Sequence, residues 1–480
     1  MSSVQSLVHD TFSRVATLTT AVAAVLAALV PAVLRGLSDR GDLLLSILGA
    51  VVVLLALAYM LQRRRNPVRE ADTQPGTTER GGMQLLLYLS PVIFLNIVFP
   101  LVSPAMARST VGGVQMTHVV LASSITVPWL AQAACMPAYR AVGSLMAERN
   151  MAAITRRFCQ VWPAMFVQAL PLILVFAAAL WLATGWSAGA MGAYIALCAA
   201  HVLFVQSLVL ANIGERRGLW AAAWGAYALA LAVAPTLWIL PPLVAAATQL
   251  AALGRQLGHL RHYERLATRD FTADMVRGLL LGAVLWADKF VLFLATDGVF
   301  EVVVVFMAML PAVLAYNFYF VNLAPRVDRA VSGLHRAIEH EPLTSLSRSS
   351  SSLTRVVDRS VLLTAAVGMV LTLGATLLLG GLQPQNAVLA VAVSVGSWAF
   401  MVLTLLSYEL DYIGERVTAQ VLGAAHLVVA VLAFTLAGTA AAYGLLLLAD
   451  VVLIVVAWSR YRRTWTQPEY TLFWRHAISW

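Results

Sequence analysis

Apolar runs of about 20 residues recur along the whole chain, and they constrain its fold more than any other feature. One of them begins at Gly278 and ends at Ala295. Such runs are long enough to cross a hydrocarbon core of roughly 30 Å. In lipid every backbone donor and acceptor needs an internal partner, so the runs must be helices. Because 60% of residues are hydrophobic and 11% are charged, we predict an all-α polytopic membrane protein.

The pattern predicts about fourteen transmembrane helices. The expected spans are 15–34, 43–62, 83–103, 113–137, 161–183, 189–211, 219–238, 240–257, 276–296, 299–323, 360–380, 386–409, 417–436 and 440–459. Arginines gather in alternate loops, while the opposite loops hold only Arg35, Arg40 and Arg108. The positive-inside rule then predicts cytoplasmic N- and C-termini. We expect a bacterial inner-membrane protein, whose net charge of +9 suits anionic lipid headgroups and not nucleic acid.

Two short motifs recur at nearly the same offset. Ile213-Gly-Glu-Arg216 returns as Ile413-Gly-Glu-Arg416, two hundred residues later. Ala152-Ala-Ile-Thr-Arg156 has a counterpart in Ser351-Ser-Leu-Thr-Arg355, at an offset of 199. Matches in the same topological position predict two six-helix halves in parallel duplication, an arrangement that other transporters use.

The expected organisation places an appended hairpin before these halves. The predicted parts are a membrane hairpin at 1–62, a cytoplasmic linker at 63–81, a first half at 82–258, an inter-half linker at 259–274, a second half at 275–463 and a cytoplasmic tail at 464–480. The segment between Pro325 and Ser352 is expected to be a solvated connector. Its serine-rich part, 345–352, is expected to be flexible, and Val327 to His340 could form an amphipathic surface helix.

The sequence lacks the motifs that are typical of several classes of enzyme and metal-binding protein. The only lysine, Lys289, is followed by Phe290, so there is no Gly-Lys-Ser/Thr of an ATP-binding loop. The zinc motif His-Glu-x-x-His does not occur. Cys135, Cys159 and Cys198 have no metal or disulfide spacing. We therefore expect no enzyme activity, no cofactor and no metal site.

Asp288 and Lys289 stand in the middle of one apolar run. Charges at bilayer depth cost roughly 2.5 to 3.5 kcal/mol each on insertion scales and usually face a bundle interior or a water-filled cavity. The pair could be a structural ion pair or part of a substrate or ion pathway. Neighbouring residues point about 100° apart on a helix, which disfavours an ideal pair. Asp450, midway along the last span, is the best further counter-ion for Lys289.

Other intramembrane side chains complete the candidate pathway. Trp286 lies three residues before Lys289 and could give a cation–π contact, a platform for a sugar ring, or only packing. A soft alignment of the two halves places Asn96 opposite Asp288, and Asn317 could line a cavity. The histidines His118, His201 and His426 are expected to be helix–helix contacts.

Two six-helix halves in parallel duplication resemble the multidrug/oligosaccharidyl-lipid/polysaccharide (MOP) flippase superfamily. Trp286-Ala-Asp-Lys289, Met307-Ala-Met-Leu-Pro-Ala312 and Tyr316-Asn-Phe-Tyr319 resemble the Pel exopolysaccharide transporters more narrowly. The topology resemblance covers about 82–462 and the motif resemblance about 276–325, while the N-terminal hairpin departs from the pattern.

The resemblance implies a cavity between the halves that opens alternately to each side and binds a glycan or lipid-linked glycan. Asp288, Lys289 and Asp450 would be its switch. Candidate partners are a cytoplasmic glycosyltransferase and other exopolysaccharide assembly proteins. Two alternatives stay open: a small-molecule or drug/cation antiporter of the same fold, and a membrane scaffold that transports nothing.

Overall fold

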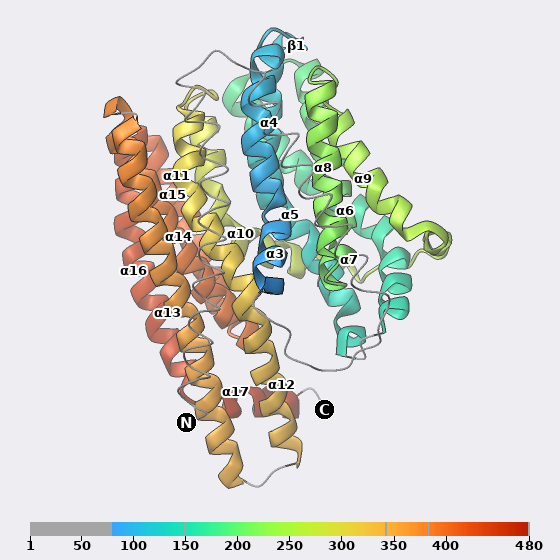
Figure 1. Ribbon diagram of the computed structural model, residues 1–480, viewed down its shortest axis with the longest axis vertical. Coiled ribbons are helices and arrows are strands. Elements are labelled where there is room, and N and C mark those ends of the chain that lie inside the picture. The colour runs from blue at the N-terminus through green and yellow to red at the C-terminus, as the bar shows by residue number, and fades with distance from the viewer. Residues whose placement is uncertain (1–78, 148–149, 341–342, 383, 479–480) are drawn as a thin grey trace. The chain divides into compact units, whose positions relative to one another are not determined.

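The computed structural model describes residues 79–147, 150–340, 343–382 and 384–478. The predicted hairpin at 1–62 and nearly all of the linker at 63–81 lie outside these residues. The chain divides into two compact units, Met1–Met275 and Val276–Trp480. Helices dominate both units (Figure 1).

The first unit holds seven α-helices and a small hairpin within its described part. The elements are α3 (Glu79–Tyr88), α4 (Ser90–Ala107), β1 (Thr110–Val111), β2 (Val114–Gln115), α5 (Met116–Ala147), α6 (Met151–Thr184), α7 (Ala188–Ile213), α8 (Arg217–Val233), α9 (Leu240–Leu253) and the 3₁₀ helix η1 (Gly254–His262). In the antiparallel hairpin Thr110 pairs with Gln115. Its turn at Gly112 sits on the start of α7, since a Cβ there would lie 2.3 Å from the nitrogen of Ala190.

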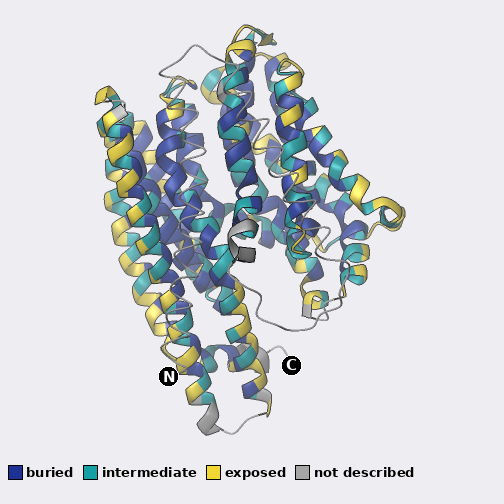
Figure 2. Ribbon diagram, in the orientation of Figure 1, coloured by how far each residue is buried: buried dark blue, intermediate teal, exposed yellow. Residues whose placement is uncertain are grey.

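The second unit begins within α10 (Thr268–Ala295). It continues with α11 (Val302–Phe318), the π-helix η2 (Tyr319–Leu323), α12 (Ala324–His340), α13 (Leu343–Leu382), η3 (Pro384–Asn386), α14 (Ala387–Ile413), α15 (Arg416–Leu436), α16 (Thr439–Trp465) and α17 (Pro468–Ile478). Long helices α13 and α16 carry exposed faces, whereas α14 is buried along most of its length (Figure 2). Those exposed faces are apolar, with Leu362 and Leu377 on α13 and Leu448 and Val452 on α16, so they suit lipid.

Helices that occupy the same place in the sequence repeat pack on equivalent neighbours in the two units. In the first unit α5 packs on α6 and α7, and α9 packs on α7 and α8. In the second unit α11 packs on α13 and α14, and α16 packs on α14 and α15. The repeated motif forms the same corner twice: Gly214 caps the end of α7 and Gly414 caps the end of α14.

Within the described ranges, nine helices are long and apolar enough to cross a membrane, or ten if the bent helix α4 counts as one span. The prediction placed twelve spans in this part of the chain. The difference lies in α8 and α9, which have 17 and 14 residues and are shorter than the spans expected there. Pro241 and Pro242 open α9, where the chain was expected to turn.

Three polar segments are more helical than predicted. Helix α10 begins at Thr268, inside the expected linker 259–274, because Asp274 in its second turn pairs with Arg140 of α5 at 3.2 Å. The tail beyond 464 contains α17. The serine-rich stretch expected to be flexible forms the first turns of α13, where Ser350 is buried and donates to Glu469 of α17. Packing against α17 thus stabilises a helix in a stretch whose own sequence gives no helical pattern.

Helix α12 is amphipathic, as the sequence allowed. Val327, Val331 and Leu334 are buried on one face, and α12 lies beside the first part of α13 (Figure 1). The described parts of the segment between Pro325 and Ser352 are therefore packed helix, in α12 and at the start of α13, and not a solvated connector.

Candidate functional site

Asp288 and Lys289 form a buried ion pair on α10. The Nζ atom of Lys289 lies 2.9 Å from Oδ1 of Asp288, and both side chains are almost wholly shielded from solvent. The two groups lie close together, but the pair is not ideal, as expected for neighbours that point about 100° apart, because Oδ1 of Asp288 has no hydrogen-bond partner among the described residues. The close approach is possible because of the flexible four-carbon stem of lysine. It folds back along its own helix so that Nζ donates to the backbone oxygen of Leu285 at 3.0 Å, and Asp288 lies beside that position.

Two aromatic side chains from other helices complete this cluster. The hydroxyl of Tyr443 on α16 donates to Oδ2 of Asp288 at 3.0 Å. The ring of Phe400 on α14 lies 5.5 Å from Nζ of Lys289, within the range of a cation–π contact. Each charge therefore has an opposite charge and at least one further partner, which offsets part of the large cost of removing both from water.

A second acid–base pair lies in the same unit. Nδ1 of His426 on α15 is 2.9 Å from Oδ1 and 3.0 Å from Oδ2 of Asp450 on α16, and both residues are fully buried. Asp450 thus pairs with His426 and not with Lys289 as the sequence suggested. His426 makes a helix–helix contact, and its Nε2 has no hydrogen-bond partner among the described residues.

Phe400 joins the two pairs. Its ring meets His426 edge-on at 5.1 Å between ring centroids, and it also faces Lys289. Close helix packing makes this possible, because Gly423 of α15 lies against the backbone of Leu280 on α10. A Cβ at Gly423 would be only 2.1 Å from the oxygen of Leu280. Gly423 is three residues before His426, so this approach puts the His426 face of α15 towards α10.

The remaining predicted pathway residues take no part in these pairs. Trp286 is half-buried on α10, and the ring beside Lys289 is that of Phe400. Asn317 donates to the backbone oxygen of Val313 at 2.8 Å. Asn96, in the first unit, makes the equivalent bond to Val92 at 2.8 Å. Both amides are therefore held by their own helices.

Sequence reasoning missed a buried carboxylate near the end of α14. Glu409 is fully buried and accepts a hydrogen bond from the hydroxyl of Tyr319, which opens the π-helix η2. Two residues on, Asp411 accepts from Nε of Arg277 at 2.6 Å. A carboxylate inside an apolar run was a usable signal at Glu409. Tyr443 could also have been found, since it lies two helical turns before Asp450 on the same face of α16.

A row of aromatic rings runs beside Glu409. Tyr316 lies 4.6 Å from Phe320, Phe320 lies 4.9 Å from Tyr408, and Tyr408 lies 6.2 Å from Tyr412, each between ring centroids. All four residues are half-buried. The row follows one side of α11, η2 and α14, and it offers ring surface that is not enclosed by the unit itself.

His201, one of the histidines of the first unit, also makes a helix–helix contact. His201 on α7 lies 2.9 Å from the hydroxyl of Tyr227 on α8, and its other ring nitrogen lies 2.9 Å from the backbone oxygen of Leu197. Among the described residues no group of three or more His, Cys, Asp or Glu side chains is placed to hold a metal ion.

No protein-family model and no curated protein sequence matches the chain. Among solved structures, the chain is similar to one described as the crystal structure of MATE in complex with MaL6. The identity is 14%, the match covers 81% of this chain and 97% of that chain, and the TM-score is 0.42.

Proposed function

We propose that this chain is a secondary transporter of the MOP type that exports a polysaccharide or lipid-linked glycan across a bacterial inner membrane. It would work by alternating access, with no catalytic step of its own. The observation that carries the proposal is the buried Asp288–Lys289 pair, held by Tyr443 within a membrane-spanning bundle. Ionisable groups at this depth typically mark ion or substrate pathways.

The pair gives the transporter a means of switching. Lys289 is the partner of Asp288 in the present arrangement, and Tyr443 reaches the other carboxylate oxygen. A coupling proton, a sodium ion or a group of the substrate could take the place of Lys289 at Asp288. Such a ligand shifts the conformational equilibrium only if it binds one state more tightly than the other.

The half-buried aromatic row supports a glycan as the cargo. The faces of aromatic rings carry partial negative charge, and the C–H groups on the face of a sugar ring carry partial positive charge. Rings spaced like Tyr316, Phe320 and Tyr408 could therefore contact successive sugars. The same region carries the sequence motifs that resemble Pel exopolysaccharide transporters.

Replacement of the native gene tests the proposal. A strain with Asp288→Asn and Lys289→Met together should lose surface glycan while the protein still reaches the membrane at its normal level. The matched control is Glu301→Gln, which neutralises an exposed carboxylate at the start of α11 and should leave surface glycan unchanged. Normal surface glycan in the double variant would favour the scaffold alternative.

The second candidate is a proton-coupled antiporter of small cations, and the buried His426–Asp450 pair favours it. Imidazole and carboxylate side chains can exchange a proton during transport. Protein reconstituted into liposomes should then accumulate a cationic dye when a proton gradient is imposed. Dye transport that is lost in Asp450→Asn, in a strain whose surface glycan is normal, would select this function over glycan export.

A further inference from the structure

A polar pocket lies in the first unit, and its lining shares no residue with the Asp288 site. Its volume is about 290 Å³, and it forms where α6 begins, α7 ends, α8 begins and α9 runs into η1. The residues that matter for its chemistry are Thr155, Ser207, Arg216, Leu219, Gln249 and Gln256. Since α6 and α7 are long enough to cross a membrane, the pocket lies at the end of membrane-spanning helices.

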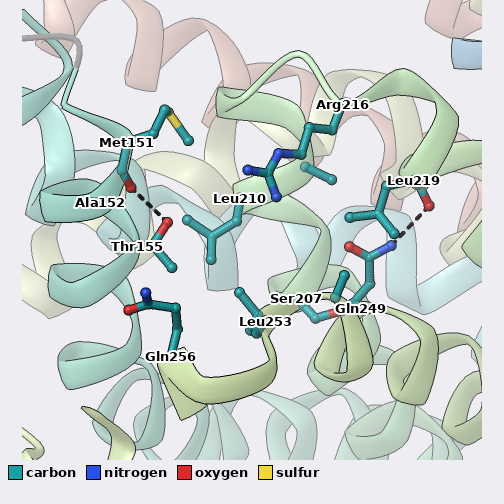
Figure 3. Close-up of a pocket in the computed structure, with 12 residues that line it drawn as sticks. Met151, Ala152, Thr155, Ser207, Leu210, Arg216, Leu219, Gln249, Leu253 and Gln256 are labelled. Atoms are coloured by element: carbon teal, nitrogen blue, oxygen red, sulfur yellow. Dashed lines mark hydrogen bonds between the residues drawn. The ribbon is translucent and has the colours of Figure 1, made fainter. Parts of the chain in front are cut away.

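Arg216 gives the pocket its charge. Among the described residues that line the pocket, Arg216 alone is ionisable. Figure 3 shows its guanidinium extending into the space that Thr155, Gln249 and Gln256 surround. The next residue, Arg217, does not line the pocket. It donates to Oδ1 of Asn212 at 2.8 Å and lies over the ring of Tyr88. The pocket thus presents a guanidinium with no carboxylate in its lining.

The neutral polar groups of the lining are two hydroxyls and two amides, and both hydroxyls already donate to backbone oxygens of their own helices, Thr155 to Met151 and Ser207 to Phe204. Nε2 of Gln249 donates one hydrogen to the backbone oxygen of Leu219 at 3.0 Å, which fixes the amide and leaves its second N–H. Gln256 contributes another amide. The corner before Arg216 is tightly packed, since a Cβ at Gly214 would lie 3.1 Å from the methyl of Met151 and 3.6 Å from Cγ of Arg216, while Arg216 itself is exposed.

We infer that this pocket binds a phosphate group. A planar guanidinium offers parallel N–H donors that match two phosphate oxygens, and the two amides supply donors for a third. The position at the ends of membrane-spanning helices fits the phosphate of a lipid headgroup, and the same chemistry fits a free phosphate ester. This inference is independent of the proposed transport function, because none of the pocket residues belongs to the Asp288 site.

Calorimetric titration of the purified full chain in detergent tests the inference with three probes: dioctanoyl phosphatidate, glycerol 3-phosphate and dioctanoylglycerol. Wild-type protein should bind phosphatidate but not dioctanoylglycerol, which has the same acyl chains without phosphate. Binding of glycerol 3-phosphate as tight as that of phosphatidate would identify a free phosphate as the ligand. Weaker or undetectable binding would identify the lipid headgroup.

Arg216→Gln should weaken phosphate binding about tenfold or more, since charged hydrogen bonds contribute at that level. Arg216→Lys should lose less, because it keeps the charge. The matched control is Arg255→Gln, which removes an exposed arginine of η1 that does not line the pocket and should bind as wild type does. If Arg216→Gln does not fold, Gln256→Leu provides the same comparison. Equal binding by wild type, Arg216→Gln and Gln256→Leu, or equal binding of dioctanoylglycerol and phosphatidate, would overturn the inference.

Discussion

Nδ1 of His426 lies 2.9 Å from Oδ1 of Asp450, between two helices that follow each other in the chain. Asp450 therefore pairs with His426, and Lys289 pairs with Asp288. The second unit therefore holds two buried acid–base pairs, and the ring of Phe400 contacts both of them. The two pairs can be perturbed independently, which makes their roles separable by mutation.

The Asp288–Lys289 pair should be more important for transport than for stability. Asp288→Asn alone leaves an unpaired buried ammonium and should destabilise the protein by about 3–5 kcal/mol, whereas removal of both charges should be far milder. Lys289→Arg keeps the charge but not the compact shape of lysine, so it should impair transport at near-normal protein levels. Transport and membrane protein level are measured together. Full activity in both Lys289→Arg and the double neutral variant would mean that the pair is only structural.

Asp450 should be coupled to His426 more strongly than to Lys289. A double-mutant cycle with Asp450→Asn and His426→Phe should give an interaction free energy of about 0.5–3 kcal/mol, as expected for residues in contact. The cycle of Asp450→Asn with Lys289→Met should give a smaller value. Both can be measured by chemical unfolding in detergent. A larger value for the lysine cycle would contradict the pairing described here.

Gly423 should not tolerate even a methyl group. In Gly423→Ala the new Cβ would meet the backbone oxygen of Leu280 at 2.1 Å, so α15 must move away from α10. Overpacking of this kind costs about 1–3 kcal/mol. The control is Gly444→Ala on α16, where nothing lies within 4 Å of the added Cβ, and it should be neutral or stabilising by about 0.5–1 kcal/mol. Thermal melting of the two variants in detergent distinguishes them, and equal melting temperatures would be the contrary result.

The aromatic row should affect export through its rings and not through its hydroxyl groups. Tyr408 lies between Phe320 and Tyr412, so Tyr408→Ala interrupts the row while Tyr408→Phe preserves it. Export of surface glycan should fall in the alanine variant and stay near wild type in the phenylalanine variant. Protein level is the control in each strain. Normal export in Tyr408→Ala would remove the row from the proposed pathway.

The predicted orientation can be checked with single cysteines at exposed positions. In a background without Cys135, Cys159 and Cys198, Ala267→Cys should react only with a membrane-permeant reagent, because its loop is predicted to be cytoplasmic. Ala188→Cys, at the start of α7, should also react with an impermeant reagent. Both positions are exposed in the structure. The reverse labelling pattern would invert the topology.

The sequence alone determined the class of this protein and the approximate position of most of its helices. A bilayer leaves an apolar run such as 276–296 no stable alternative to a helix, because backbone groups have no water to bond. The sequence also indicated that Asp288, Lys289 and Asp450 are unusual, because placing an ionised group at that depth costs free energy. These conclusions depend on the solvent around each segment and not on which helix packs beside which.

Only the tertiary structure decided which side chains the buried charged residues pair with. Whether Asp450 meets Lys289 or His426 depends on the rotation of α15 and α16 about their axes, and hence on contacts such as that between Gly423 and Leu280. The helical state of the serine-rich stretch at the start of α13 depends likewise on α17, where Glu469 accepts from Ser350. Such contacts join residues far apart in the chain, so no local pattern of hydropathy or charge encodes them.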